Sequence, residues 1–283
     1  MSVEHYENFP VASWLCPSEL RPAVRAIYWF ARTADDIADE GEAPAEQREA
    51  TLRAYREDLL KAAAHEPGSG RWAGVFDPLA GVIASHRLPL PLLAALLDAF
   101  EEDTRHAGYA DRAALLHYCS RSADPIGRLL LHLHGIDDPA LLRQSDAVCS
   151  ALQLINFWQD LSVDLPRGRV YVPRSDAAAH ATTPADCLRD PHAAASRALV
   201  RELCAWAQAL LLEGAPIALA VPGRVGWELR FVVQGGLRIL AKISAMNFAS
   251  FARRPRLHAA DHLVIGIRAL TMRPSLFEQT RIA

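Results

Sequence analysis

Residues 153–164 read QLINFWQDLSVD, and this stretch does most to indicate how the chain folds. In an α-helix, at about 100° per residue, four of its polar side chains lie within about 80° of one another: Gln153, Asn156, Asp160 and Asp164. Most of the positions around them are apolar. The stretch therefore predicts a mostly buried helix that carries one polar stripe.

A second stretch, residues 28–39, reads YWFARTADDIAD and has the same character. Four of its side chains fall within about 60° of one another on a helix: Tyr28, Arg32, Asp35 and Asp39. Asp36 points about 100° away from Asp35 and is predicted to face solvent.

The paired aspartates in each stripe predict a bound cation. Two carboxylates one turn apart repel each other, and burial without a partner raises their pKa values. Mg²⁺ prefers oxygen ligands and is commonly shared between carboxylates and substrate phosphates. A single DxxxD motif is usually a solvated or ion-paired face, but two such motifs in apolar sequence favour a metal clamp for a diphosphate.

The rest of the chain shows the same helical spacing of apolar residues, and no segment alternates as a strand would. We predict a single all-α domain over residues 1–283. Its helices are expected at 18–40, 45–64, 75–86, 90–106, 111–134, 138–163, 191–220, 225–250 and 258–272. Residues 165–191 are expected to form an irregular connection, which is either a flap over a site or a solvated link.

Composition excludes several classes of function. The net charge is −3 and no run of Lys or Arg suggests nucleic-acid binding. The five cysteines form no CxxC pair, which argues against a disulfide framework or a zinc site. The first residues lack a signal-peptide pattern, and the longest apolar stretch, 209–221, is too short to span a bilayer. We expect a cytoplasmic protein, with any membrane contact peripheral at the inner face.

With these motifs in place, the chain resembles the squalene/phytoene synthases. Their Tyr, Arg and DxxxD pattern is matched by residues 28–39, and their QxxNxxxDxxxD motif by residues 153–164. The RxYxP segment that follows is matched by Arg169, Tyr171 and Pro173. Residues 118–127, YCSRSADPIG, are similar to the family segment whose tyrosine borders the reacting carbons. Helix packing is the alternative role for Tyr118.

The resemblance implies a class I terpenoid synthase-like helical bundle with a central cavity, and an isoprenoid diphosphate substrate. It implies two or three Mg²⁺ ions held by Asp35, Asp39, Asn156, Asp160 and Asp164. It implies substrate contacts from Tyr28, Arg32, Gln153, Asn156, Gln159 and Arg169. It implies catalytic roles for Asp35, Asp39, Asp160, Asp164, Tyr118 and Tyr171.

Within the family, residues 8–13 (NFPVAS) and 156–160 (NFWQD) look most like the hydroxysqualene synthase branch. That branch converts presqualene diphosphate and water to hydroxysqualene, for hopanoid synthesis, and needs no NADPH. Gln159 stands where relatives carry an arginine, and Gly236 where many carry a late tyrosine. The loss of phosphate donors suits a site for one diphosphate. A presqualene diphosphate synthase would then supply the substrate.

Three alternatives remain open at this point. The enzyme could condense two prenyl diphosphates to presqualene diphosphate, squalene or phytoene. It could be a non-catalytic relative that acts in assembly, although such a protein would be expected to lose its aspartates. It could also be a helical lipid-binding domain with incidental acidic stripes.

Overall fold

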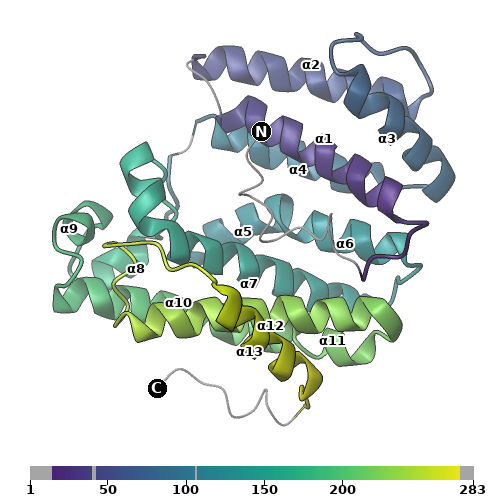
Figure 1. Ribbon diagram of the computed structural model, residues 1–283. Coiled ribbons are helices and arrows are strands. Elements are labelled where there is room, and N and C mark those ends of the chain that lie inside the picture. Colours follow the sequence, from purple (N-terminus) through teal and green to yellow (C-terminus); the bar gives the residue numbers. More distant parts are fainter. Residues whose placement is uncertain (1–14, 40–42, 106, 275–283) are drawn as a thin grey trace. The chain divides into compact units, whose positions relative to one another are not determined.

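The computed structural model describes residues 15–39, 43–105 and 107–274 (Figure 1). In these ranges every regular element is a helix, and the all-α prediction is confirmed. Residues 8–13, which carry part of the branch resemblance, lie outside the described ranges.

The helices form two compact units that alternate along the chain. Unit 1 comprises Met1–His106 and Arg121–Leu142, and unit 2 comprises Ala107–Ser120 and Arg143–Ala283. Two helices, α5 (Arg112–Ser122) and α7 (Pro139–Asp164), run from one unit into the other. The single domain over residues 1–283 and its central cavity stay predictions.

Unit 1 is built around the helix that carries the first acidic stripe. Its helices are α1 (Arg21–Asp39), α2 (Ala45–Ala63), α3 (Ala73–His86), α4 (Leu90–Asp103) and α6 (Asp124–Leu133). Helix α1 packs against α2, α3 and α4. Its buried Phe30 stacks on Tyr55, with ring centroids 5.5 Å apart. The Tyr55 hydroxyl donates to the Phe30 carbonyl at 3.0 Å, so α1 is tied to α2 by both packing and a buried hydrogen bond.

Unit 2 holds the second stripe on α7. Its other elements are η2 (Leu165–Arg167), α8 (Arg174–Ala179), α9 (Pro184–Arg189), α10 (Ala194–Gly214), α11 (Ile217–Ala220), α12 (Gly223–Ala245) and α13 (Ala259–Leu270). Two glycines allow close packing on α7. A Cβ at Gly214 would lie 2.4 Å from the Gln144 carbonyl oxygen. A Cβ at Gly236 would lie 3.0 Å from side-chain carbons of Leu152 and Leu211, so the position has no space for a tyrosine without repacking.

Three predicted segments differ from the structure. The helix expected over 111–134 breaks at Ala123 into α5 and α6, because Pro125 has no N–H to donate to the carbonyl four residues earlier and its ring clashes with that carbonyl. The connection expected over 165–191 contains η2, α8 and α9. The helix expected over 191–220 is divided between α10 and α11.

One segment of the described chain, Ala194–Ala220, is long and apolar enough to cross a membrane by length and composition. Half of its most apolar window is buried inside the protein. Helix α10 packs against α9 and α12 in unit 2, as a core helix would.

The close approach at Gly214 generates a stability test. Gly214→Ala should lower the free energy of unfolding by about 1–3 kcal/mol, because the new methyl group meets backbone atoms that cannot move aside easily. The matched control is Gly235→Ala in α12, where a Cβ meets no atom within 4 Å. That change should raise stability by about 0.5–1 kcal/mol through helix propensity. Urea unfolding measures both, and equal effects would contradict the packing described.

Candidate active site

The first acidic stripe lies along α1 in unit 1. Ile27, Phe30 and Ala34 on the neighbouring face of the helix are fully buried. The four predicted stripe residues are all only partly buried: Tyr28, Arg32, Asp35 and Asp39. The structure therefore brings together on one accessible strip the side chains that the spacing predicted.

Arg32 supplies positive charge to this stripe from within the same helix. Its guanidinium donates to Asp35 at 2.8 Å and also pairs with Asp36. The Asp36 side chain is 40% exposed, in agreement with the predicted solvent-facing direction, but it shares the arginine with Asp35. Because both pairs are partly exposed, each adds little to stability, and their main effect is to fix the direction of the Arg32 side chain.

The second stripe lies along α7 in unit 2 and has more deeply buried surroundings. Leu154, Trp158 and Leu161 are at most 2% exposed. The four predicted stripe residues remain partly accessible: Gln153, Asn156, Asp160 and Asp164. Helical spacing thus identified an accessible polar strip on this part of α7, although Leu152, Ser162 and Val163 are also only partly buried.

Burial makes Asp164 difficult to ionise. Desolvation, followed by repulsion from Asp160, raises the pKa of Asp164 to about 6, although Arg169, Arg167 and Arg254 oppose this shift. Arg254 also pairs with Asp160 at 2.5 Å. A divalent cation with oxygen ligands suits two carboxylates that repel each other in this way.

Gln159 is buried and bonded within the protein. Its side chain is 1% exposed, and its amide nitrogen donates to the Pro255 carbonyl at 2.8 Å. This contact fixes the chain segment that presents Arg254 to the adjacent Asp160. The structure thus gives Gln159 a positioning role, and its contact with substrate stays a prediction.

A cluster of four aromatic rings adjoins the second stripe. Tyr171 stacks on Phe157, with centroids 3.7 Å apart and planes 7° apart. Tyr118 lies 6.3 Å from both of these rings, and Tyr109 lies 5.5 Å from Tyr118. Tyr118, Phe157 and Tyr109 are nearly buried, at 4–6% exposed. Phe157 is one turn before Asp160 on α7, so the rings lie next to the acidic pair.

The sequence did not indicate Tyr109. It lies in a short non-helical segment before α5 and belongs to no recognisable motif. Its backbone carbonyl accepts from the Arg174 N–H at 3.0 Å, just after the RxYxP segment. Only the fold brings Tyr109 to Tyr171.

The segment after α7 is tied down at several points. The Arg169 N–H donates to the Asp164 carbonyl at 3.0 Å, and Gly168 makes the turn with a φ of 80°. The Tyr171 ring is fixed by its stack on Phe157. Of the two roles left open for this connection, a loosely solvated link does not fit its first part, residues 165–175.

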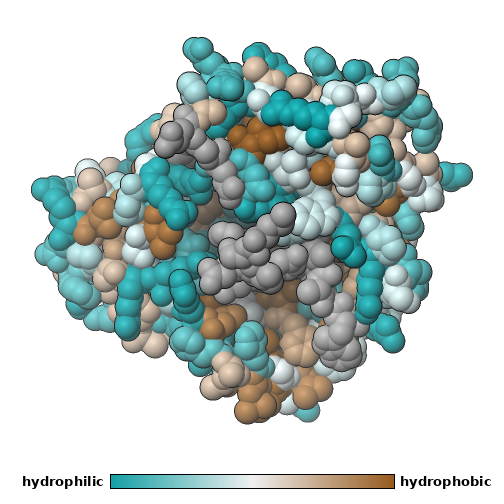
Figure 2. All heavy atoms as spheres, turned by 45° about the horizontal axis from the view of Figure 1, so that its top comes forward, coloured by the Kyte–Doolittle hydropathy of each residue, from teal (hydrophilic) through white to brown (hydrophobic). Residues whose placement is uncertain are grey.

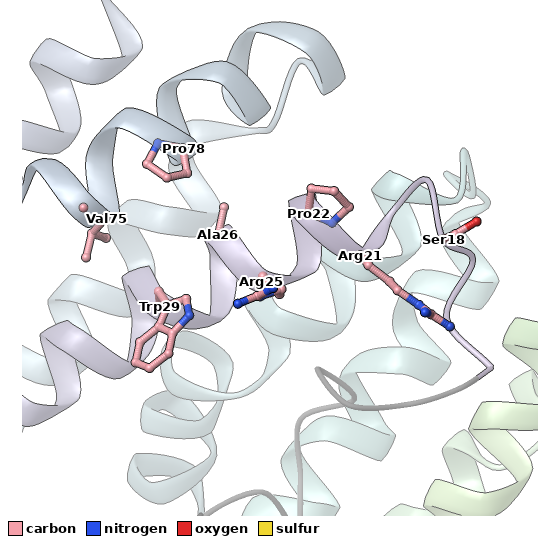
Figure 3. A pocket seen from close by; sticks show the side chains of 9 residues that line it. Ser18, Arg21, Pro22, Arg25, Ala26, Trp29, Val75 and Pro78 are labelled. Carbon is pink, nitrogen blue, oxygen red and sulfur yellow. The ribbon is translucent and has the colours of Figure 1, made fainter. Parts of the chain in front are cut away.

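The two stripes belong to different units, and their facing each other across one site stays a prediction. In the described part of the chain, no three acidic, His or Cys side chains gather as a ready-made metal cage. A shallow groove of about 440 Å³ lies in unit 1 between the first half of α1 and α3 (Figure 3). Its lining includes Arg25, Trp29 and Val75 but no predicted site residue.

The chain is similar in sequence to proteins of known family. A family model described as squalene/phytoene synthase matches residues 3–261. Hydroxysqualene synthase of Zymomonas mobilis is 38% identical over 170 residues, which cover 59% of this chain and 54% of that protein. Hydroxysqualene synthase of Rhodopseudomonas palustris is 33% identical over 243 residues, which cover 85% of this chain and 80% of that protein.

A solved structure is also similar. The crystal structure of squalene synthase HpnC from Alicyclobacillus acidocaldarius matches with a TM-score of 0.78 and 38% sequence identity. The match covers 86% of this chain and 90% of that chain. It confirms the predicted class I terpenoid synthase-like helical fold.

The raised pKa of Asp164 predicts how stability depends on pH without metal. The carboxyl binds its proton more tightly in the folded state, so stability falls as the pH rises from about 4 to about 6, and the full cost of ionisation is present above pH 6. Below about pH 4 the group is protonated in both states and the cost disappears. Asp164→Asn should therefore be more stable than the unchanged protein at pH 8, by on the order of 2 kcal/mol.

Urea unfolding at pH 8, 6 and 4 measures this difference, which should shrink as the pH falls. Asp77→Asn, at an exposed position on α3, is the control and should change little at any pH. A stabilisation by Asp164→Asn that is equal at pH 4 and pH 8 would contradict the burial of this carboxylate.

Proposed function

The chain belongs to the squalene/phytoene synthase family, and we propose that it is a hydroxysqualene synthase. The reaction converts presqualene diphosphate and water to hydroxysqualene and diphosphate. One observation carries the proposal: the Asp160–Asp164 pair lies beside a cluster of aromatic rings. A site that ionises a lipid diphosphate needs charge at one end and an apolar wall at the other.

At the diphosphate end, five residues would hold two or three Mg²⁺ ions: Asp35, Asp39, Asn156, Asp160 and Asp164. When bound by these residues, Mg²⁺ would neutralise the charge that builds on the departing diphosphate. The side chains of Tyr28, Arg32, Gln153 and Arg169 would orient the same group. The pKa of Asp164 near 6 supports this assignment, because a nearby dication favours the ionised carboxylate and relieves its repulsion from Asp160.

At the hydrocarbon end, the rings of Tyr118, Phe157 and Tyr171 would face the carbocation that ionisation leaves. A cation near an aromatic face gains about 0.5–2 kcal/mol. The near-complete burial of Tyr118 and Phe157 also excludes bulk water, which would otherwise trap the cation before it rearranges.

The bond changes are simple in outline. The carbon–oxygen bond of presqualene diphosphate breaks, and its electron pair leaves with the diphosphate. The cyclopropylcarbinyl cation rearranges, and the oxygen of one water molecule forms a bond to carbon. The proton released from that water balances the charge, so no reductant is consumed and NADPH is not required.

The proposed reaction also implies which enzyme supplies the substrate and where in the cell this protein works. Presqualene diphosphate comes from a synthase that joins two farnesyl diphosphates, so we propose functional coupling to such an enzyme and a role in hopanoid synthesis. We place the protein in the cytoplasm, in peripheral contact with the inner face of the membrane, because both substrate and product are lipids.

A second candidate is reduction to squalene, since the protein in the similar solved structure is named a squalene synthase. Condensation of two prenyl diphosphates to presqualene diphosphate or phytoene is a further alternative within the family. A non-catalytic assembly role is disfavoured, because both acidic motifs are intact.

The product formed distinguishes these activities. Purified protein incubated with Mg²⁺ and presqualene diphosphate, without NADPH, should give hydroxysqualene by lipid extraction and mass spectrometry. Asp160→Asn should lower the rate at least a hundredfold, on the order of 3 kcal/mol in the barrier, because one carboxylate ligand is lost.

Squalene formed only with NADPH would support the second candidate. A product from farnesyl diphosphate alone would retain the family and refute the branch. Absence of any product, with Mg²⁺-dependent diphosphate binding also absent, would refute an enzymatic role.

The aromatic cluster gives a separate test. Phe157→Leu keeps an apolar side chain of similar volume but removes a ring face, so kcat should fall by roughly threefold to thirtyfold. The affinity for inorganic diphosphate with Mg²⁺ should be nearly unchanged. Trp206→Leu is the control, because Trp206 contacts the buried Trp158 and belongs outside the four-ring cluster. An equal loss of kcat in both variants would show a general packing effect instead.

A further inference from the structure

Helix α13 presents an aliphatic stripe to solvent. Leu263, Ile267 and Leu270 are 68%, 53% and 67% exposed, and their spacing of four and three residues places them side by side. A single exposed leucine is ordinary on a protein surface, but three adjacent ones mark an interaction surface. In Figure 2, hydrophobic side chains, in brown, lie at several places on the face in view, its lower edge included.

The helix is held firmly by its other face. Asp261 is 3% exposed and lies between Arg238 and Lys242 of α12, at 2.5 and 2.6 Å. Ile265 and Ala269 are buried on the same side of α13. The aliphatic stripe is therefore presented by a fixed helix, which needs no folding step before it binds.

The chain segment that contains the stripe is basic. Between residues 252 and 274 four arginines are exposed: Arg253, Arg256, Arg268 and Arg273. The sole acidic residue in that range is Asp261, which is already buried against two cations of α12. Exposed charge along this part of the described chain is thus of one sign.

We infer that α13 docks on the surface of an anionic lipid bilayer. Leu263, Ile267 and Leu270 would enter the boundary between headgroups and acyl chains, while Arg268 and Arg273 would contact lipid phosphates. Arg268 lies about 100° around α13 from Ile267, and Arg273 follows the end of the helix. An aliphatic stripe with arginines on and just after its helix is typical of interfacial binding. Insertion of three aliphatic side chains and attraction by two arginines each give weak binding alone, so both contributions are required.

Charge argues against a second copy of this chain as the occupant. A two-fold contact through α13 would bring the same arginine-rich surface of both copies together, and like charges in an interface are unfavourable. An anionic surface removes this repulsion. The inference concerns where the protein binds, and it holds whichever lipid reaction the enzyme performs.

Vesicle sedimentation of the full chain tests the inference. Binding should be strong to phosphatidylcholine vesicles that contain phosphatidylglycerol, weak to phosphatidylcholine alone, and reduced by salt. The variant Leu263→Ser/Ile267→Ser/Leu270→Ser should lose at least roughly tenfold in partition coefficient. Arg268→Gln/Arg273→Gln should lose a similar factor on anionic vesicles only.

Leu60→Ser is the matched control, because Leu60 is 59% exposed but lies on α2. It should bind vesicles as the unchanged protein does. Thermal melting and light scattering on all variants show whether each one folds and in what oligomeric state. Three results would overturn the inference: equal binding to neutral vesicles, unchanged binding by the triple serine variant, or a dimer that this variant abolishes.

Discussion

The repulsion between Asp160 and Asp164 is the constraint on which the proposed site depends. The two carboxylates are one turn apart on α7, and burial with mutual repulsion brings the pKa of Asp164 to about 6. Rotation of the helix could expose Asp164 to water, but Leu154 and Trp158 are buried in the core and prevent it, and the helical spacing keeps the two carboxylates close together. Close packing at Gly214 and Gly236 further fixes α7 against α10 and α12. Destabilising groups that a fold holds in place are expected at functional sites.

The two stripes obtain their positive charge from different sources. On α1, Arg32 is three residues from Asp35 and four from Asp36, so the helix itself supplies the partner. On α7, Arg254 comes from the loop after α12, almost a hundred residues further along the chain. That loop is fixed at the next residue by the buried hydrogen bond from Gln159 to Pro255. Two consecutive residues of α7 therefore contact two consecutive residues of the loop. Gln159 holds the loop in position through Pro255, and Asp160 forms an ion pair with Arg254.

These differences explain how much the sequence could predict. Helical spacing is a local property, so it identified both stripes and most of the helices, including the long α7 and α12. Contacts between distant segments leave no such periodic signal. The glutamine at 159 carries the same amide whether it meets substrate or the Pro255 carbonyl, and Tyr109 has no motif around it. The break at Ala123 could have been read from Pro125, since a proline ring clashes with the carbonyl four residues before it and interrupts a helix there.

The stack of Tyr171 on Phe157 couples the two ends of the proposed site. At 3.7 Å between centroids, nothing fits between these rings, so they act as one body with two outer faces. Tyr171 is two residues after Arg169, and Arg169 acts electrostatically on Asp164. Movement of the ring pair would therefore displace an arginine at the acidic pair. Phe157 is on the same helix as both aspartates, so the aromatic rings and the charged end of the proposed site are built on one rigid element. The segment 165–171 connects the end of this helix to Tyr171, which stacks back on Phe157.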